Sequence, residues 1–262
     1  MGAPARLYRC AHWFGARGGE PAHQAVARVS LAHAQAQDAV HCPLECQTLA
    51  DELTQALGLS TEPLAVHSRA EDRAMYLQRP DYGRRLNEAS RQTLQQAAES
   101  GQRFDLAVAI VDGLSALAVQ QNSTPFLTAL YDAFGRDKYE LQLAPLTLVE
   151  QGRVAIGDEV GALLNADAVL VMVGERPGLS SPDSLGLYMT WGPEVGLKDD
   201  RRNCISNVRP AGLAYEEAAR RLLLLLTEAR ERKLSGVKLK DRSEDNVLEG
   251  GSGSTSNFLV AD

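Results

Sequence analysis

The sequence predicts an α/β protein in which a Rossmann-like, mostly parallel sheet is flanked by helices and preceded by a mainly helical N-terminal region. Continuous apolar runs of β type at 106–111 and 168–173 indicate strands buried on both faces. Helical patterns separate and follow these runs, which is typical of βαβ units. With 262 residues, 44% of them hydrophobic, the chain can form a sizeable core.

The first hundred residues show mostly helical patterns. Helices are expected over 21–40, over about 48–57 and from the Pro80–Asp81 turn to about 98, with a short strand at 64–67. Gly58 is expected to end the second of these helices, because glycine readily adopts the backbone conformation of a helix end. The segment MYLQRPDYGRRL, residues 75–86, breaks the regular pattern. We expect this region to form a separate layer or subdomain.

The next region alternates between strand and helix. Strands are expected at 106–111, 140–149 and 168–173 and, more weakly, at 185–191 and 203–208; helices are expected up to about 134 and over 158–164 and 215–232. Pro145 suggests that its strand lies at a sheet edge or contains a bulge. The predicted division is therefore 1–100, mainly helical; 101–240, Rossmann-like and ligand-binding; and 241–262, a flexible Gly/Ser-rich tail.

Composition and charge exclude several classes of function. The net charge of −7 is spread over mixed residues without a Lys/Arg block, which argues against nucleic-acid binding. The apolar run at 222–226 is far too short to cross a bilayer. The N-terminus lacks the apolar stretch and cleavage site of a secretory leader. We therefore expect a cytosolic protein.

The cysteines give little sign of a metal site. His41, Cys42 and Cys46 lie close together in the sequence, but a closed zinc site needs a fourth ligand, usually from a second paired cluster. No such cluster is present, and Pro43 interrupts the spacing. We expect reduced cysteines beside a helix start and no metal.

Two strands of the predicted sheet end in glycine-containing loops, VDGLS at 111–115 and VGERPGL at 173–179. Ligands of open α/β sheets bind beyond the carboxyl ends of the strands, where such loops gather. Gly174 is expected to let a ligand approach the backbone, and Glu175 to accept hydrogen bonds. Two alternatives stay open: Glu175 and Arg176 form a solvated turn, and Asp112 caps the next helix.

The motifs of common enzyme classes are missing from the sequence. Neither loop is a G-x-G-x-x-G, and no G-x-x-x-x-G-K-[ST] occurs, so ordinary nicotinamide or ATP chemistry lacks its signature. All five histidines lie within the first 67 residues, apart from the predicted Rossmann-like region 101–240, and no Ser/His/Asp triad stands out. The residues alone therefore predict a Rossmann-like domain that holds a ligand, and they identify no catalytic residue in this chain.

Five stretches together resemble the light-subunit family of ethanolamine ammonia-lyase. They are MYLQRPDYGRRL, VDGLSALAV, QGRVAIGDEVG, VLVMVGERPGLSSPDSLGLYMTW and NCISNVRPAGL, and the resemblance covers roughly residues 24–236. It implies a lyase subunit that depends on adenosylcobalamin and converts ethanolamine to acetaldehyde and ammonia by a radical mechanism. The cofactor would lie between residues 101–240 of this chain and a TIM-barrel large subunit, which would carry the substrate site.

The resemblance also implies three cofactor-binding residues. Val154 matches the valine of the GRV segment, Glu175 the glutamate of GERPG and Cys204 the cysteine of CISN. The alternative for Cys204 is plain core packing. The chain has no D-x-H-x-x-G motif, so the cofactor would bind with its own benzimidazole attached.

Two further questions stay open at this point. The resemblance implies the bacterial cytoplasm. Relatives often carry a longer N-terminal extension that is associated with packing into a bacterial microcompartment, whereas only about twenty residues precede the family-like region here, so that location stays open. The alternative function is a binding module that holds a nucleotide or cobalamin without catalysis.

Overall fold

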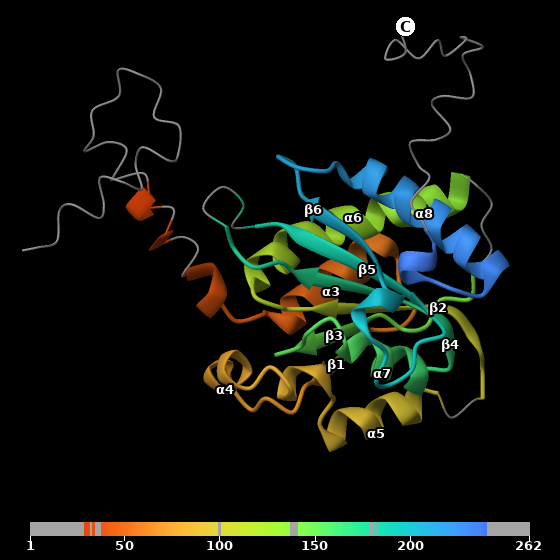
Figure 1. The fold of residues 1–262 in the computed structure, drawn as a ribbon, viewed down its shortest axis with the longest axis horizontal. Helices are drawn as coiled ribbons and strands as arrows, with labels where there is room; N and C mark the ends of the chain where they lie inside the picture. The colour runs from red at the N-terminus through yellow and green to blue at the C-terminus, as the bar shows by residue number, and fades with distance from the viewer. Residues whose placement is uncertain are drawn as a thin grey trace, which may run out of the picture.

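The computed structural model describes residues 29–31, 33–34, 38–98, 101–136, 141–178, 181 and 183–239. They form an α/β fold around one sheet with the strand order β1-β3-β2-β4-β5-β6 (Figure 1). In that order the strands are Leu64–His67, Thr147–Glu150, Phe104–Val111, Ala166–Gly174, Leu185–Trp191 and Asn203–Val208. The first four strands of this order are parallel, β5 is antiparallel to β4, and β6 is antiparallel to β5. The predicted fold class, a mostly parallel sheet flanked by helices, is confirmed.

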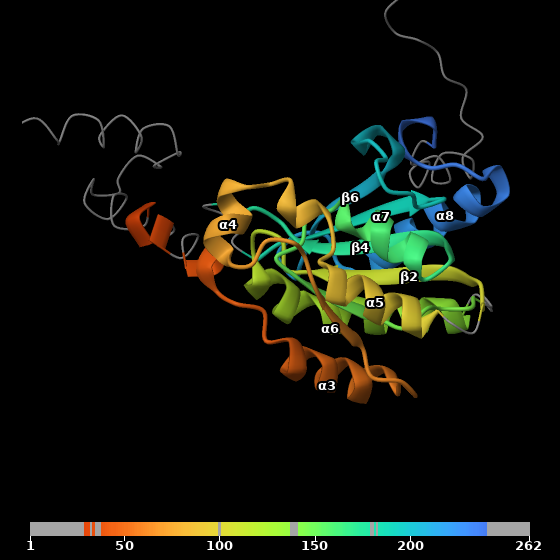
Figure 2. The same ribbon diagram turned by 90° about the horizontal axis from the view of Figure 1, so that it is seen from below.

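Helices cover both faces of the sheet. On one face lie α3 (Cys46–Leu57), α6 (Ala116–Arg136) and α8 (Tyr215–Arg232); on the other lie α5 (Glu88–Ala97) and α7 (Ile156–Leu163). Figure 2 shows α3 beside α6. Because α3 and α5 lie on opposite faces of the sheet and β1 is one of its strands, the residues before 100 contribute to the sheet and to both helical layers. The short α4 (Arg73–Gln78) and the 3-10 turns η1 (Tyr82–Arg84), η2 (Asp199–Arg201) and η3 (Gly236–Lys238) connect these elements. The division of the chain at residue 100 stays a prediction.

The unbroken apolar runs of the central strands are explained by burial on both faces. In β2, Leu106, Val108 and Ile110 belong to the core under α3, α6 and α8, whereas Ala107 and Ala109 belong to the core under α5 and α7. Each large aliphatic side chain that is fully buried contributes about 1.5–3 kcal/mol. A polar residue at either kind of position would lose water without gaining a partner.

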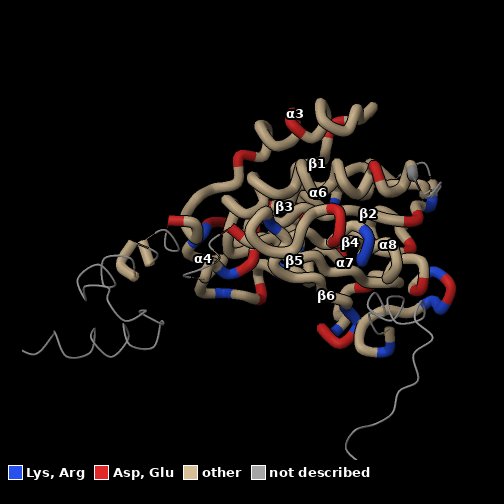
Figure 3. Tube along the Cα trace, turned by 90° about the horizontal axis from the view of Figure 1, so that it is seen from above, with Lys and Arg blue, Asp and Glu red and all other residues tan. Residues whose placement is uncertain are grey.

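Charged residues lie mainly on the outer helices and loops, as Figure 3 shows. Among the described residues, no helix is long and apolar enough to cross a membrane.

Most predicted elements have the expected position. The helix predicted at 48–57 is α3, which ends at Gly58 with φ +62°. The predicted bounds of β1, β5, β6 and α8 agree with the structure. The helix predicted over 21–40 lies partly outside the described residues, of which 29–31, 33–34 and 38–41 are helical. The tail 241–262 lies outside them entirely.

Two predicted elements were wrong in extent. Pro80–Asp81 opens only the turn η1, because the chain then becomes extended at Arg85, whose carbonyl accepts a hydrogen bond from the Arg69 N–H at 2.9 Å. Helix α5 starts later, where the Asn87 side chain accepts the Ser90 N–H at 2.8 Å.

The strand predicted at 140–149 covers only Thr147–Glu150, and residues 137–140 lie outside the described part of the chain. This strand is β3, which lies between β1 and β2 and not at an edge. Pro145 precedes it, because proline has no N–H to donate to a neighbouring strand.

Candidate cofactor-binding site

The two glycine-containing loops meet at the carboxyl ends of β2 and β4. Leu114 donates its N–H to the Gly174 carbonyl at 3.0 Å. A Cβ at Gly174 would overlap the carbonyl oxygen of Ser115, and one at Gly113, where φ is +59°, would overlap the backbone of Gly174. The missing side chain of Gly174 therefore lets the two loops pack against each other. Gly174 also lines the cavity beside these loops, so its role in letting a ligand approach stays a prediction.

Asp112 holds a third loop, the one between β3 and α7. Its buried carboxylate accepts the N–H groups of Gln151 at 2.9 Å and Gly152 at 3.0 Å. Burial raises the pKa of Asp112 to about 6, although these two bonds and Arg73, 3.6 Å away, oppose that shift. Asp112 therefore shapes the loop that presents the next two residues, Arg153 and Val154. Capping of α6 falls instead to Ser115 Oγ, which accepts the N–H of Ala118.

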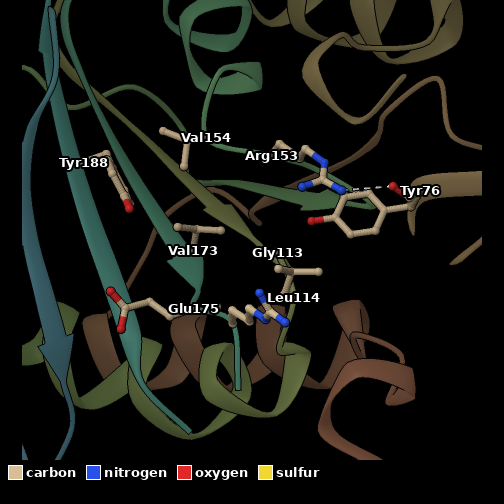
Figure 4. Close-up of a pocket in the computed structure, with 10 residues that line it drawn as sticks. Tyr76, Gly113, Leu114, Arg153, Val154, Val173, Glu175 and Tyr188 are labelled. Atoms are coloured by element: carbon tan, nitrogen blue, oxygen red, sulfur yellow. Dashed lines mark hydrogen bonds between the residues drawn. The ribbon is translucent and has the colours of Figure 1, made fainter. Parts of the chain in front are cut away.

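These loops enclose a cavity of about 410 Å³. Its apolar surface includes Val154 and Val173, and its polar groups include Tyr76, Arg153 and Glu175 (Figure 4). A second cavity of about 300 Å³ shares Arg153, Val154 and Tyr188 with the first and is also lined by Cys204. The structure thus brings the three predicted residues to two adjoining cavities, with Val154 common to both.

Glu175 is half-buried at the mouth of the first cavity. Its N–H donates to the Ser184 carbonyl at 3.0 Å, and its Oε2 accepts the Asn207 N–H at 3.3 Å. Gly186 leaves room for this side chain, since a Cβ there would lie 3.0 Å from Oε1. No described residue donates a hydrogen bond to Oε1. The solvated-turn interpretation therefore suits the exposed Arg176 but not Glu175, which is held in place and keeps one free acceptor.

Cys204 lies on β6 beside Tyr188 of β5, and its Sγ is 3.2 Å from Ser206 Oγ. Core packing, the alternative for Cys204, is wrong because the residue is exposed. Burial raises the pKa of Tyr188, and the neighbouring Cys204 adds to this rise. On this side of the sheet α7 packs on β4 and β2, so Cys204 and Ser206 stay open beside it. Together, β5 and β6 form an open floor next to the cavities.

Two buried carboxylates at the start of α7 support the site, and sequence reasoning missed both. Asp158 pairs with the buried Arg202, which lines the second cavity. Glu159 accepts the Leu86 N–H at 3.0 Å and pairs with Arg85 at 2.9 Å. These pairs fix the segments that border the second cavity. The only signal in the sequence was two adjacent acids on an otherwise apolar helix, and nothing local identified their arginine partners.

The fold and the site together define the class of protein. Cavities at the carboxyl ends of parallel strands, with an apolar surface and separate donor and acceptor groups, are typical of Rossmann-like domains that bind a nucleotide or a cofactor. The open β5–β6 floor indicates that such a ligand would be covered from one side only.

Comparison with known proteins narrows this class to one family. The model of the family described as ethanolamine ammonia-lyase light chain matches residues 6–240. The ethanolamine ammonia-lyase small subunit of Pseudomonas aeruginosa (strain UCBPP-PA14) is 54% identical over 231 residues, which cover 88% of this chain and 83% of that protein. The small subunit of Azotobacter vinelandii is 52% identical over 233 residues, covering 88% and 84%. The chain belongs to the ethanolamine ammonia-lyase light-chain family.

Proposed function

We propose that this chain is the cofactor-holding small subunit of an adenosylcobalamin-dependent ethanolamine ammonia-lyase, which converts ethanolamine to acetaldehyde and ammonia. The observation that carries this proposal is the position of the three predicted cofactor-binding residues. Val154, Glu175 and Cys204 come from three separate segments, yet they line two cavities that adjoin through Arg153, Val154 and Tyr188. The sequence resemblance singled out the same three residues as cofactor contacts.

The chemical groups at these cavities suit one side of a corrinoid. Neither cavity could enclose so large a cofactor, but both open beside the β5–β6 floor. Val154 offers an apolar surface, and the free Oε1 of Glu175 can accept a hydrogen bond from a ribose hydroxyl or a corrin side-chain amide. Cys204 is small and exposed, which allows close approach. The cofactor supplies the radical chemistry when bound, while the protein places it and excludes water.

A large subunit completes the proposed enzyme. The described residues that line the cavities include no histidine. Two buried carboxylates of the supporting segments, Asp112 and Asp158, are engaged by backbone N–H groups and by Arg202, respectively. We therefore assign the substrate site to the large subunit, which would cover the β5–β6 floor and the cofactor on it. The bacterial cytoplasm is the proposed location, and packing into a microcompartment stays an open alternative.

Reconstitution tests this function directly. Ammonia release from ethanolamine is measured with adenosylcobalamin and the purified chain alone, the large subunit alone, or both together. We expect turnover only when both subunits are present, because each would hold one side of the cofactor. Turnover by this chain alone would contradict the divided site. Tight cobalamin binding by this chain alone, together with no turnover in the mixture, would favour the binding-module alternative.

A further inference from the structure

The wall of the first cavity away from Glu175 is built from Tyr76 and Arg153. Figure 4 shows the hydroxyl end of Tyr76 and the guanidinium of Arg153 on one side of the cavity and Glu175 on the other. The guanidinium carbon of Arg153 lies 4.5 Å from the centre of the Tyr76 ring, and that of Arg73 lies 4.7 Å from it. These distances are typical of cation–π contacts.

The two arginines differ in how their charge is used. Arg73 is engaged by Asp112 and by the Gly113 carbonyl at 2.8 Å. Arg153 donates to the Tyr76 carbonyl at 3.1 Å but forms no ion pair with any described residue, and its Nε has no described hydrogen-bond partner. The cavity therefore contains a guanidinium that is not paired with any described carboxylate.

The Tyr76 hydroxyl adds a donor beside that charge. Burial raises the pKa of Tyr76 to about 12, with Asp112 adding to the rise and the two arginines opposing it, so the hydroxyl keeps its proton at neutral pH. No described residue accepts a hydrogen bond from it.

Both side chains are held in position before any ligand binds. The backbone N–H of Arg153 donates to the Gly83 carbonyl at 2.8 Å, and its guanidinium donates to the Tyr76 carbonyl at 3.1 Å. The Tyr76 ring packs closely on Gly83, where an added Cβ would lie 3.0 Å from it. Tyr76 and Gly83 both belong to MYLQRPDYGRRL, the segment whose irregular pattern had no assigned role. Its fold places a fixed aromatic ring and a fixed guanidinium at one end of the cavity.

We propose that Arg153 and Tyr76 form an anion subsite that takes a phosphodiester group. The inference rests on the proposed function, in which the anion is the phosphodiester of the cofactor's nucleotide loop. Guanidinium and hydroxyl donors together match the unprotonated oxygens of a phosphodiester, which carry its negative charge. With donors at this end and the acceptor Glu175 at the other, the cavity distinguishes the two ends of its ligand. Arg153 and Tyr76 thus set the orientation of the cofactor.

A comparison of two ligands tests the subsite in the reconstituted complex. Adenosylcobinamide lacks the nucleotide loop and its phosphodiester, whereas adenosylcobalamin has both. Dissociation constants for the two ligands are measured by absorbance titration for the wild type, Arg153→Gln, Tyr76→Phe and the control Arg69→Gln. Arg69 is an exposed arginine that lines neither of the two cavities.

The expected result is selective for the phosphodiester. Arg153→Gln should weaken adenosylcobalamin binding about 10-fold, the lower range for a hydrogen bond to a charged group. Tyr76→Phe keeps the ring and should also weaken it about 10-fold, because the hydroxyl donates to the same charged group. Both variants should leave adenosylcobinamide binding within about 2-fold of wild type, and Arg69→Gln should change neither constant appreciably. The loss in Arg153→Gln should also shrink as salt is raised, because salt screens the guanidinium in the wild type.

Two contrary outcomes distinguish failure of the anion subsite from failure of the proposed function. Equal losses for the two ligands, or no loss for either, in folded Arg153→Gln and Tyr76→Phe complexes would overturn the subsite and leave the proposed function standing. Failure of the wild-type complex to bind adenosylcobalamin would overturn both. If Arg153→Gln does not fold, as judged by circular dichroism, the ligand comparison with Tyr76→Phe decides the question.

Discussion

Replacement of Glu175 by glutamine probes the acceptor end of the cavity. The change keeps the size of the side chain and one oxygen, but it removes the charge and introduces an N–H₂ donor. The Asn207 N–H donates to Oε2 of Glu175, and Gly186 leaves room for the side chain, so Oε1 is left for a ligand. A ligand hydroxyl or amide that donates to Glu175 would therefore face a weaker acceptor or a competing donor.

The expected loss follows from the environment of this carboxylate. A hydrogen bond to a charged group contributes about 1.5–3 kcal/mol, equal to about 10- to 150-fold in affinity. Because Glu175 is only half-buried, solvent screens part of this energy, and we expect a loss near the lower limit, about 10-fold. The KM for ethanolamine should change much less, since the substrate site is assigned to the large subunit.

Cofactor titration of the reconstituted Glu175→Gln complex measures this loss, with circular dichroism as the folding control. Glu194→Gln is the matched variant, because Glu194 is exposed and lines neither cavity. An unchanged cofactor dissociation constant in a folded Glu175→Gln complex would refute the reasoning and return Glu175 to the solvated turn.

Three other predictions concern stability. Gly174→Ala should lower the melting temperature markedly, because its Cβ would overlap the carbonyl of Ser115; a melting temperature equal to wild type would show that the two loops separate easily. The pKa of Asp112 rises from 3.8 to about 6 on folding, so its contribution to stability is present below pH 3.8 and is lost as the pH rises through about 6. The free energy of unfolding, measured by denaturant titration from pH 4 to 8, should fall across this range in the wild type but lack this fall in Asp112→Asn. Parallel pH profiles for the two proteins would contradict the raised pKa of Asp112. Truncation after Asp241 should leave the melting temperature and reconstituted activity nearly unchanged, because the Gly/Ser-rich tail can bury little; a large drop in melting temperature would show that the tail docks.

The central strands could be predicted because burial on both faces leaves a local trace. The uninterrupted apolar runs of β2 and β4 are visible in the sequence, and glycines or charges mark where they end. The reduced extent of β3 was not visible. Pro145 interrupts the regular pairing with β2, which returns before it only as an isolated bridge between Leu143 and Leu106, while the apolar pattern runs on without a break. Likewise, the extended backbone at Arg85 depends on its contact with Arg69, sixteen positions earlier in the chain.

The candidate site could be predicted only in part, for the same reason. Glu175 stood out locally, as a charge next to a glycine at the end of a buried strand. Val154 and Cys204 have no such local signal and were identified only through the family resemblance. The stacking of Arg153 on Tyr76 and the pairing of Asp158 with Arg202 join residues far apart in the sequence. Such contacts exist only once the fold has brought the segments together.

The most direct test of the central claim is a structure of the complex reconstituted from this chain, the large subunit and adenosylcobalamin. The claim is that this chain holds one side of the cofactor at two adjoining cavities. The account predicts the corrinoid against the β5–β6 floor, in contact with Val154, Glu175 and Cys204 and covered on its other side by the large subunit. A cofactor enclosed by the large subunit alone, with no contact to these three residues, would contradict it.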